Sequence, residues 1–338
     1  SGADYSGLSG SFPARARPPR RTPRPPGPRP SWASCRRRAG DVSVTYDPTG
    51  SGTGREQFLS GQVQFAGTDA ALTDEELASS TEVCNGEQAF DLPIYISPPI
   101  AVVFNIEGVD SLNLTPEVIA QIFAGTITNW NDPAIAESNP DVELPDLDIV
   151  PVHRSDDSGT TENFTEYLSA NASDAWTHGP VETWPIDGGQ SGDGTSGMIS
   201  TVEGGNGTIG YADASQAGNL SIAAIQVGEE FVTYSADAAA KAVEVSPPRA
   251  EGRADNDIVV ELDRTTTEEG AYPIVLVSYL ALCGSYADET AGENVKAYAS
   301  FIVSDEGQQV AAENAGSAPP LSDSLQEEAQ AAIDAITV

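Results

Sequence analysis

Two short stretches of the sequence combine glycines with hydroxyl side chains. Residues 153–164 read HRSDDSGTTENF and include one arginine, and residues 49–54 read TGSGTG. Each stretch follows a predicted strand and leads into a predicted helix, where the first backbone N–H groups lack helical partners and the helix dipole is positive. Glycine lets the backbone approach a ligand closely, and serine and threonine add hydroxyl donors. The pattern predicts two sites that can bind an anion.

Other functions of glycine-rich stretches make different demands on the sequence. A nucleotide-binding P-loop has the pattern GxxxxGK[ST], but the only lysines are Lys241 and Lys296, and neither lies in a glycine-rich stretch. A dinucleotide-binding fingerprint at GSGTGR lacks its third spaced glycine. For the SGTT segment at residues 158–161, an ordinary helix cap remains the alternative.

The charge of the chain is strongly acidic and unevenly distributed. The 338 residues carry a formal net charge of −35, and from Asp41 onward there are 50 acidic residues and seven basic ones. Such a surface repels nucleic acid and anionic lipid, so we expect no nucleic-acid partner. An anion has to be bound by local N–H and O–H groups and by Arg154.

The three cysteines and two histidines form no metal or redox motif. Cys35, Cys84 and Cys283 are too far apart for a CxxC pattern, and neither histidine has a second ligand at a metal-binding spacing. We therefore expect no metal and no cofactor. In an exported protein Cys84 and Cys283 can pair as a disulfide and leave Cys35 free, and unpaired thiols are the alternative.

Alternating strand and helix patterns indicate an α/β fold. Residues 41–46 and 63–72 read as strands on either side of a helix that begins near Arg55, which is a βαβ pattern. Residues 115–125 predict a short amphipathic helix with Thr115 as its N-cap. A fold of this class can place both glycine-rich stretches at the ends of strands.

Further along the chain, apolar spacing predicts more elements. In the segment that follows the SGTT residues, Phe164, Tyr167 and Leu168 share one helical face. The 12-residue apolar run at residues 272–283 is too short to span a bilayer, so we expect a buried strand. The tail reads as helical over two ranges, 293–315 and 322–336.

Four segments carry a resemblance to a known family: YDPTGSGTGREQFLSGQVQFAGTDAALTDEEL, HRSDDSGTTENFTEYLS, ITNWNDPAI and GTIGYADAS. They resemble the phosphate-binding protein of bacterial phosphate ABC transporters, especially its actinobacterial forms, and the resemblance runs from Asp41 to the C-terminus. It implies an α/β, two-lobed periplasmic-binding-protein fold of type II. In this fold each lobe is a mixed β-sheet flanked by helices, and the ligand lies in the interdomain cleft.

The resemblance also implies a discontinuous domain organisation. Domain I is expected to comprise residues 1–97 and 273–338, and domain II residues 98–272, because the chain of the family crosses twice between the lobes. The break at Pro98 and Pro99 in the apolar run of residues 91–106 suits such a crossing.

Site residues are implied position by position. The expected phosphate-binding residues are Ser51, Asp69, Arg154, Ser158, Gly159 and Thr160, and Asp156 is expected to orient Arg154 through an ion pair. The family also places a hydroxyl residue and a phenylalanine in an N-terminal loop, where GSFPA offers Ser11 and Phe12. Asp69 would give selectivity, because phosphate at neutral pH still has a proton to donate and sulfate has none. A buried polar group left unpaired can discriminate between ligands by factors of roughly 10⁴ to 10⁵.

The function implied by the resemblance is transport, not catalysis. The protein is expected to capture inorganic phosphate and to deliver it to the membrane permease of a phosphate ABC transporter. We expect a monomer outside the cytoplasm, in the periplasm or at the cell surface. Lipid anchorage through a cysteine outside this sequence stays open.

Alternatives from other classes remain. A phosphate-ester hydrolase needs a nucleophile with a base or a pair of metal ions, and the sequence shows neither. Another oxyanion-binding surface protein, or a structural or adhesive one, is a further alternative, and a structural protein would lack a cleft that can bind a ligand.

Residues 13–40 do not fit the pattern on either side of them. They contain nine arginines and eight prolines, and a proline in a helix interior costs about 3 kcal/mol. The resembling family has a helix in this part of the chain. Our hypothesis is that the segment is translated in the wrong reading frame or reflects a gene-model error, and a genuine disordered insertion is the alternative.

Overall fold

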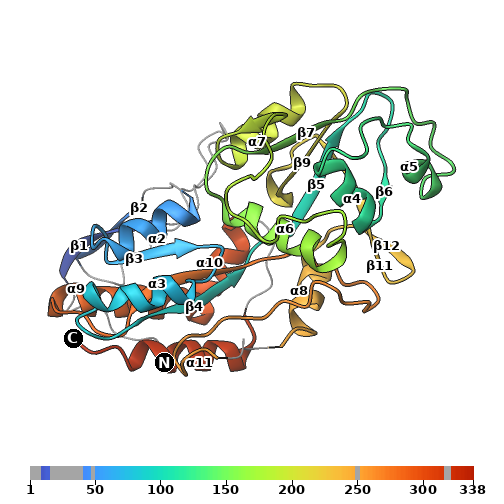
Figure 1. Cartoon of the computed structure of the whole chain (residues 1–338). Helices are drawn as coiled ribbons and strands as arrows, with labels where there is room; N and C mark the ends of the chain where they lie inside the picture. Colours follow the sequence, from blue (N-terminus) through green and yellow to red (C-terminus); the bar gives the residue numbers. More distant parts are fainter. Residues whose placement is uncertain (1–8, 16–40, 47–49, 248–251, 316–320) are drawn as a thin grey trace, which may run out of the picture. The chain divides into compact units, whose positions relative to one another are not determined.

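The computed structural model describes residues 9–15, 41–46, 50–247, 252–315 and 321–338. The chain folds as two compact units. Unit 1 comprises Ser1–Ile96, Arg249–Val260 and Val277–Val338, and unit 2 comprises Ser97–Pro248 and Glu261–Leu276. Both units combine a five-stranded sheet with helices (Figure 1).

The sheet of unit 1 is mixed and has the strand order β2-β1-β3-β13-β4. The first three strands run parallel to one another, and β13 runs antiparallel to both β3 and β4. The strands are β1 (Ser9–Arg15), β2 (Asp41–Tyr46), β3 (Phe65–Thr68), β4 (Ala89–Ile96) and β13 (Val277–Cys283). The tail of the chain thus supplies a strand to the interior of a sheet that begins near the N-terminus.

Helices pack around this sheet (Figure 1). They are α2 (Ser51–Leu59), α3 (Asp74–Ser79), the 3₁₀ helix η1 (Ser80–Glu82), α9 (Glu289–Val303), α10 (Asp305–Ala315) and α11 (Asp323–Asp334). Phe58, Phe65 and Tyr298 lie in one buried apolar core that joins α2, β3 and α9. The helices expected in the tail are present, and every residue of β13 is buried, as expected of that apolar run.

Cys84 and Cys283 form a disulfide across 199 residues of sequence. Cys283 is the last residue of β13, and Cys84 follows η1. Of the two states left open by the sequence, the structure has the bridged one, which joins the C-terminal part of unit 1 to its N-terminal part.

Unit 2 contains a mixed sheet of order β10-β5-β9-β7-β8 and a smaller sheet of order β12-β11-β6. In the larger sheet β5 is antiparallel to β10 and β9, whereas β7 is parallel to β9 and β8. Its strands are β5 (Ile100–Asn105), β7 (Val150–Arg154), β8 (Gln190–Gly192), β9 (Thr208–Asp213) and β10 (Ser221–Ile222). The smaller sheet contains β6 (Asn113–Leu114), β11 (Ala224–Val227) and β12 (Glu230–Val232).

The helices of unit 2 enclose an aromatic core. They are α4 (Pro116–Phe123), α5 (Pro133–Glu137), α6 (Gly159–Asn171), α7 (Gly194–Glu203), the 3₁₀ helix η2 (Ala214–Gln216) and α8 (Ala236–Glu244). Phe164 of α6 stacks on Tyr211 of β9 with 4.5 Å between ring centroids, and Phe123 of α4 meets Phe164 edge-on with 5.1 Å between centroids. The expected helix near residue 115 is confirmed, with Thr115 accepting a hydrogen bond from the Val118 N–H.

The N-terminal segment is described only in part. Strand β1 ends at Arg15, and residues 16–40, which hold most of the anomalous segment, lie outside the described residues. Ser11 and Phe12 belong to β1, in register with Ser43 and Val44 of β2, and their side chains are not described. Among the described helices, none combines the length and apolarity that a membrane crossing requires.

Candidate functional site

The first set of predicted residues lies in unit 1, at the start of α2. The helix begins at Ser51, four residues before the predicted start near Arg55, so part of the glycine-rich stretch is helical. Gly50 precedes it with φ of 90°, a conformation that favours glycine. The first turn contains no acidic residue, so its N–H groups and positive dipole end remain suited to an anion.

Asp69 follows β3 and lies against the start of α2. Its backbone N–H donates to Ser51 Oγ at 3.0 Å, and its Oδ1 accepts a hydrogen bond from Ser278 Oγ at 2.7 Å. A serine hydroxyl has one hydrogen and two lone pairs, so Ser51 can accept from Asp69 and still donate its own hydrogen. We call Ser51, Asp69 and the first turn of α2 the unit 1 half-site.

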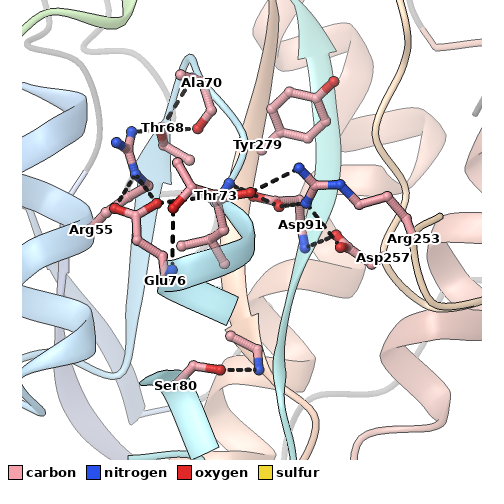
Figure 2. A network of polar contacts seen from close by, with 12 residues as sticks. Arg55, Thr68, Ala70, Thr73, Glu76, Ser80, Asp91, Arg253, Asp257 and Tyr279 are labelled. Carbon is pink, nitrogen blue, oxygen red and sulfur yellow. Dashed lines mark hydrogen bonds and ion pairs between the residues drawn. The ribbon is translucent and has the colours of Figure 1, made fainter. Parts of the chain in front are cut away.

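Buried Arg55 fixes the chain on one side of Asp69 (Figure 2). It donates from Nη1 to Thr68 Oγ1 at 3.1 Å and from Nε to both carboxylate oxygens of Glu76, at 3.1 and 3.2 Å. The Thr68 hydroxyl in turn donates to the Ala70 carbonyl and accepts from the Ala70 N–H, at 2.5 and 3.2 Å. Arg55 thereby ties α2 to the two residues that flank Asp69.

Arg253 fixes the chain on the other side (Figure 2). It donates from Nη2 to the Leu72 carbonyl at 2.8 Å, and from Nη1 to Asp91 at 3.2 Å and Asp257 at 3.0 Å. The Leu72 N–H donates to both oxygens of Asp91, which is completely buried. Burial and the nearby charge of Asp257 raise the pKa of Asp91 well above its usual range, against the opposing effect of Arg253. The loop that carries Asp69 is therefore hydrogen-bonded at both of its ends.

The second set of predicted residues lies in unit 2, where β7 ends at Arg154. Arg154 donates from Nε and Nη2 to the two oxygens of Asp156, at 2.6 and 2.5 Å. This bidentate contact fixes the plane of the guanidinium. Asp156 also accepts from the N–H of Gly194, the first residue of α7, at 3.1 Å. Burial alone would raise the pKa of Asp156, but the hydrogen bonds and charge of Arg154 lower it below its usual value. Asp156 therefore stays ionised and holds Arg154.

The start of α6 completes this second set. Ser158 is the N-cap, and its Oγ accepts from the Thr161 N–H at 3.2 Å. Gly159 and Thr160 are the first residues of the helix, and both are buried. Because the first N–H groups of a helix have no helical acceptor, this turn can bind an anion. We call Arg154, Asp156 and residues 158–160 the unit 2 half-site.

Sequence reasoning missed Tyr211, which joins the two parts of the unit 2 half-site. Its hydroxyl accepts from the Arg154 backbone N–H at 3.1 Å and shares a hydrogen bond of 2.7 Å with Thr161 Oγ1. Burial raises the pKa of Tyr211 to about 12, so the phenol is neutral. The GTIGYADAS segment contains this tyrosine, but only the pairing of β9 with β7 brings it to Arg154.

The structure brings the predicted residues together within each unit. Ser51 contacts Asp69 in unit 1, and Arg154 contacts Asp156 beside the start of α6 in unit 2. The residues missed in unit 1 are Arg55, Arg253 and Ser278. One signal was available for the arginines: so few basic residues in so acidic a chain are expected to have acidic partners.

The geometry around the histidine nearest the site does not suit hydrolysis. The ring nitrogens of His153 lie 2.9 Å from the Arg154 carbonyl and 3.3 Å from the Gly188 carbonyl, and the ring stacks on Trp184. A base that activates a serine or threonine needs a hydroxyl within hydrogen-bond reach, and these contacts are carbonyls. Among the described residues, no three His, Cys, Asp or Glu side chains are grouped to hold a metal ion.

Comparison with known proteins identifies relatives over most of the chain. The family model described as "PBP superfamily domain" matches residues 31–306. Phosphate-binding protein PstS 2 of Mycobacterium tuberculosis is 36% identical over 306 residues, which are 87% of this chain and 80% of the relative. Phosphate-binding protein PstS 3 of Mycobacterium leprae is 35% identical over 262 residues, 76% of this chain and 70% of the relative.

Solved structures show the same fold. The phosphate-bound structure of the high-affinity periplasmic phosphate-binding protein PfluDING has a TM-score of 0.71 at 22% identity and covers 87% of both chains. A putative phosphate ABC transporter substrate-binding protein from Clostridium perfringens, also with bound phosphate, has a TM-score of 0.60 at 19% identity, and the match covers 90% of this chain and 98% of that one. The expected α/β periplasmic-binding-protein fold with mixed sheets is confirmed. With the family model and the mycobacterial relatives, these matches show that the chain belongs to the PstS family of phosphate-binding proteins, a family of non-enzymatic binding proteins.

Proposed function

We propose that this protein is an extracytoplasmic solute-binding protein that captures one inorganic phosphate and delivers it to the permease of a phosphate ABC transporter. One observation carries the proposal. A buried arginine, oriented by Asp156, stands beside the start of α6, and both belong to the segment that carries the family motif. Residues of both half-sites are proposed to contact phosphate.

In this proposal the unit 2 half-site supplies the positive charge and most of the donors. Arg154 pairs with phosphate oxygens, and the N–H groups of Gly159 and Thr160 point from the start of α6 with its dipole. The Ser158 side chain is already the helix cap, so its oxygen orders the turn that presents those N–H groups. Fixed dipoles and one arginine bind the anion locally, and the net charge of −35 does not prevent this.

The unit 1 half-site supplies discrimination. Ser51 donates its hydroxyl hydrogen, and Asp69 accepts the hydrogen that phosphate retains at neutral pH. Sulfate carries no hydrogen, so its oxygen would face the carboxylate oxygen of Asp69. Two facing acceptors with no hydrogen between them cost free energy in a desolvated site. This cost lowers the affinity for sulfate relative to phosphate.

The remaining features are proposed by analogy with the family. We propose that the protein works as a monomer in the periplasm or at the cell surface, with a membrane permease as its partner. Relatives named as phosphate-binding proteins and a periplasmic structure with bound phosphate support this location and ligand.

Isothermal titration of the phosphate-free protein tests the proposal. Unfolding and refolding in phosphate-free buffer first removes any phosphate carried through purification. We expect one phosphate per chain with micromolar or tighter affinity, about −8 kcal/mol or better, and far weaker binding of sulfate. Equal affinity for the two anions, or no heat with phosphate, would contradict the proposal.

A further inference from the structure

Ser278 is a buried serine that the sequence did not connect with the site. It is 3% exposed, and its Oγ donates to Asp69 Oδ1 at 2.7 Å, across 209 residues of sequence. The pairing of β13 with β4 shifts register between Ser278 and Tyr279. Such irregularities change the direction of a side chain relative to a regular strand, and they are frequent beside functional sites.

We propose that Ser278 is a positioning residue that holds the Asp69 carboxylate in its orientation, and so determines how strongly the protein prefers phosphate to sulfate. The inference rests on the proposed function, because it gives Asp69 the role described above. Ser278 itself touches the carboxylate and acts on the anion through it.

Contacts with Ser51 and Ser278 help to fix the orientation of Asp69. Its backbone N–H is held by Ser51 Oγ at 3.0 Å, and its Oδ1 is held by Ser278 at 2.7 Å. With the backbone and one carboxylate oxygen fixed, the direction of the second oxygen is determined by the planar geometry of the group. The position of an acceptor for the phosphate hydrogen is thus set by a strand that enters the sheet from the C-terminal part of the chain.

The Ser278 hydroxyl also limits rotation of the Asp69 carboxylate. An ionised carboxylate can only accept hydrogen bonds, so its orientation decides which atom of a bound anion it faces. A carboxylate turned away from the anion would neither accept the phosphate hydrogen nor oppose a sulfate oxygen. Loss of the Ser278 hydroxyl should therefore weaken phosphate binding and relax the rejection of sulfate together.

The test compares three variants with the wild-type protein. Ser278→Ala removes the hydroxyl, and Ser278→Thr keeps it. Ser80→Ala is the matched control, because Ser80 is also a buried serine of unit 1 whose Oγ donates to the Leu77 carbonyl at 2.7 Å and accepts from the Ala89 N–H at 2.8 Å (Figure 2). Dissociation constants for phosphate and sulfate are measured for each protein by titration, with thermal unfolding to record stability.

We expect Ser278→Ala to lower the ratio of phosphate to sulfate affinity by about tenfold or more, the effect of one hydrogen bond to a charged group. Ser278→Thr should restore the ratio, and Ser80→Ala should lower stability and leave the ratio unchanged. A ratio in Ser278→Ala equal to that of the wild-type protein would overturn the inference, whether both affinities are unchanged or both fall by the same factor. If Ser278→Thr does not fold, the contrast between the two alanine variants decides. Failure of the proposed function can be told apart from failure of this inference, because in that case the wild-type protein itself would not prefer phosphate to sulfate.

Discussion

Unit 1 and unit 2 are assembled from the chain in different ways. Unit 1 joins three segments of sequence through an apolar core and through cross-links: the disulfide spans 199 residues, and the Arg253 to Asp91 ion pair spans 162. Most of unit 2 is one continuous segment, Ser97–Pro248, around a continuous apolar and aromatic core. The comparison indicates that cross-links contribute more to the stability of a unit whose segments come from distant parts of the chain.

The two half-sites differ in the same way. The unit 2 half-site lies within seven residues of sequence, 154–160, and is organised by a strand end and a helix start. The unit 1 half-site brings together Ser51 and Asp69, and Ser278 reaches it from the tail. The predicted residues of the first are contiguous in sequence, with Tyr211 and Gly194 as added contacts, whereas the second brings its residues together from distant parts of the chain.

The largest loss of stability is expected when the disulfide of unit 1 is removed. In the chain-entropy model, closing so long a loop stabilises the folded state by up to roughly 5 kcal/mol, although strain can reduce this. We expect the Cys84→Ser/Cys283→Ser variant to unfold at clearly lower urea concentration than the wild-type protein. Intact-mass measurement after alkylation, with and without reductant, checks the bridge itself. Reactive thiols at both positions in the folded, unreduced protein would refute it.

Removal of Arg253 is the next largest perturbation. Arg253→Met leaves Asp91 and Asp257 buried without their cation, and loss of one partner of a buried ion pair costs about 3–5 kcal/mol. Adding Asp91→Asn to this variant should recover part of the loss. Urea unfolding monitored by tryptophan fluorescence and circular dichroism measures both.

Arg264 provides the matched arginine in unit 2. It is buried, but its partners are the Pro273 and Val275 carbonyls, Asn163 and the half-exposed Glu166. Because Glu166 is half-exposed, Arg264→Met should destabilise the protein less than Arg253→Met does. Equal losses of stability in the two variants would contradict this contrast between the units.

Arg154→Met tests the charge of the unit 2 half-site. Loss of one member of a desolvated, hydrogen-bonded charge pair costs roughly 2–5 kcal/mol of binding, at least about 30-fold. Because Arg154 pairs with any oxyanion, phosphate and sulfate should lose affinity by similar factors. Arg154→Lys keeps the charge and loses the planar fork, so an intermediate affinity is expected. Titration with both anions checks this, and a change confined to one anion would assign discrimination to unit 2.

The smallest expected effect is the pH dependence of the Arg154 to Asp156 pair. Arg154 lowers the pKa of Asp156 in the folded protein, so the pair contributes stability above the unfolded pKa of about 3.9 and loses it as pH falls through the lower folded value. The stability difference between wild type and Asp156→Asn should be constant from about pH 5 to 7 and shrink below about pH 4. Asp157→Asn, the same change at the exposed neighbour, is the control. A difference that grows toward low pH would refute the role of the pair.

Local patterns predicted the local parts of the structure. The helix capped by Thr115 and the buried face of Phe164, Tyr167 and Leu168 formed as expected, because caps and apolar spacing act within a few residues. The start of α2 was predicted too late, since glycine-rich sequence was read as loop although glycines can occupy a first helical turn that binds an anion.

Long-range parts of the site could not be predicted from local patterns. Ser278 reaches Asp69 only because β13 lies next to β3, and Arg253 reaches Leu72 only because Arg249–Val260 belongs to unit 1. Spacing and composition contain no direct signal for such pairings. The roles of Ser51, Asp69, Ser11 and Phe12 came from the family resemblance and stay predictions.

In the proposed function, Arg154 and the start of α6 bind the anion, and Asp69 discriminates between phosphate and sulfate. The ratio of phosphate to sulfate affinity in Asp69→Asn, measured by competition titration beside the wild-type protein in one buffer, tests this division of roles. An amide can donate a hydrogen bond to sulfate, so the account predicts that sulfate binding improves, phosphate binding weakens, and the ratio falls by orders of magnitude. An unchanged ratio in Asp69→Asn would contradict it.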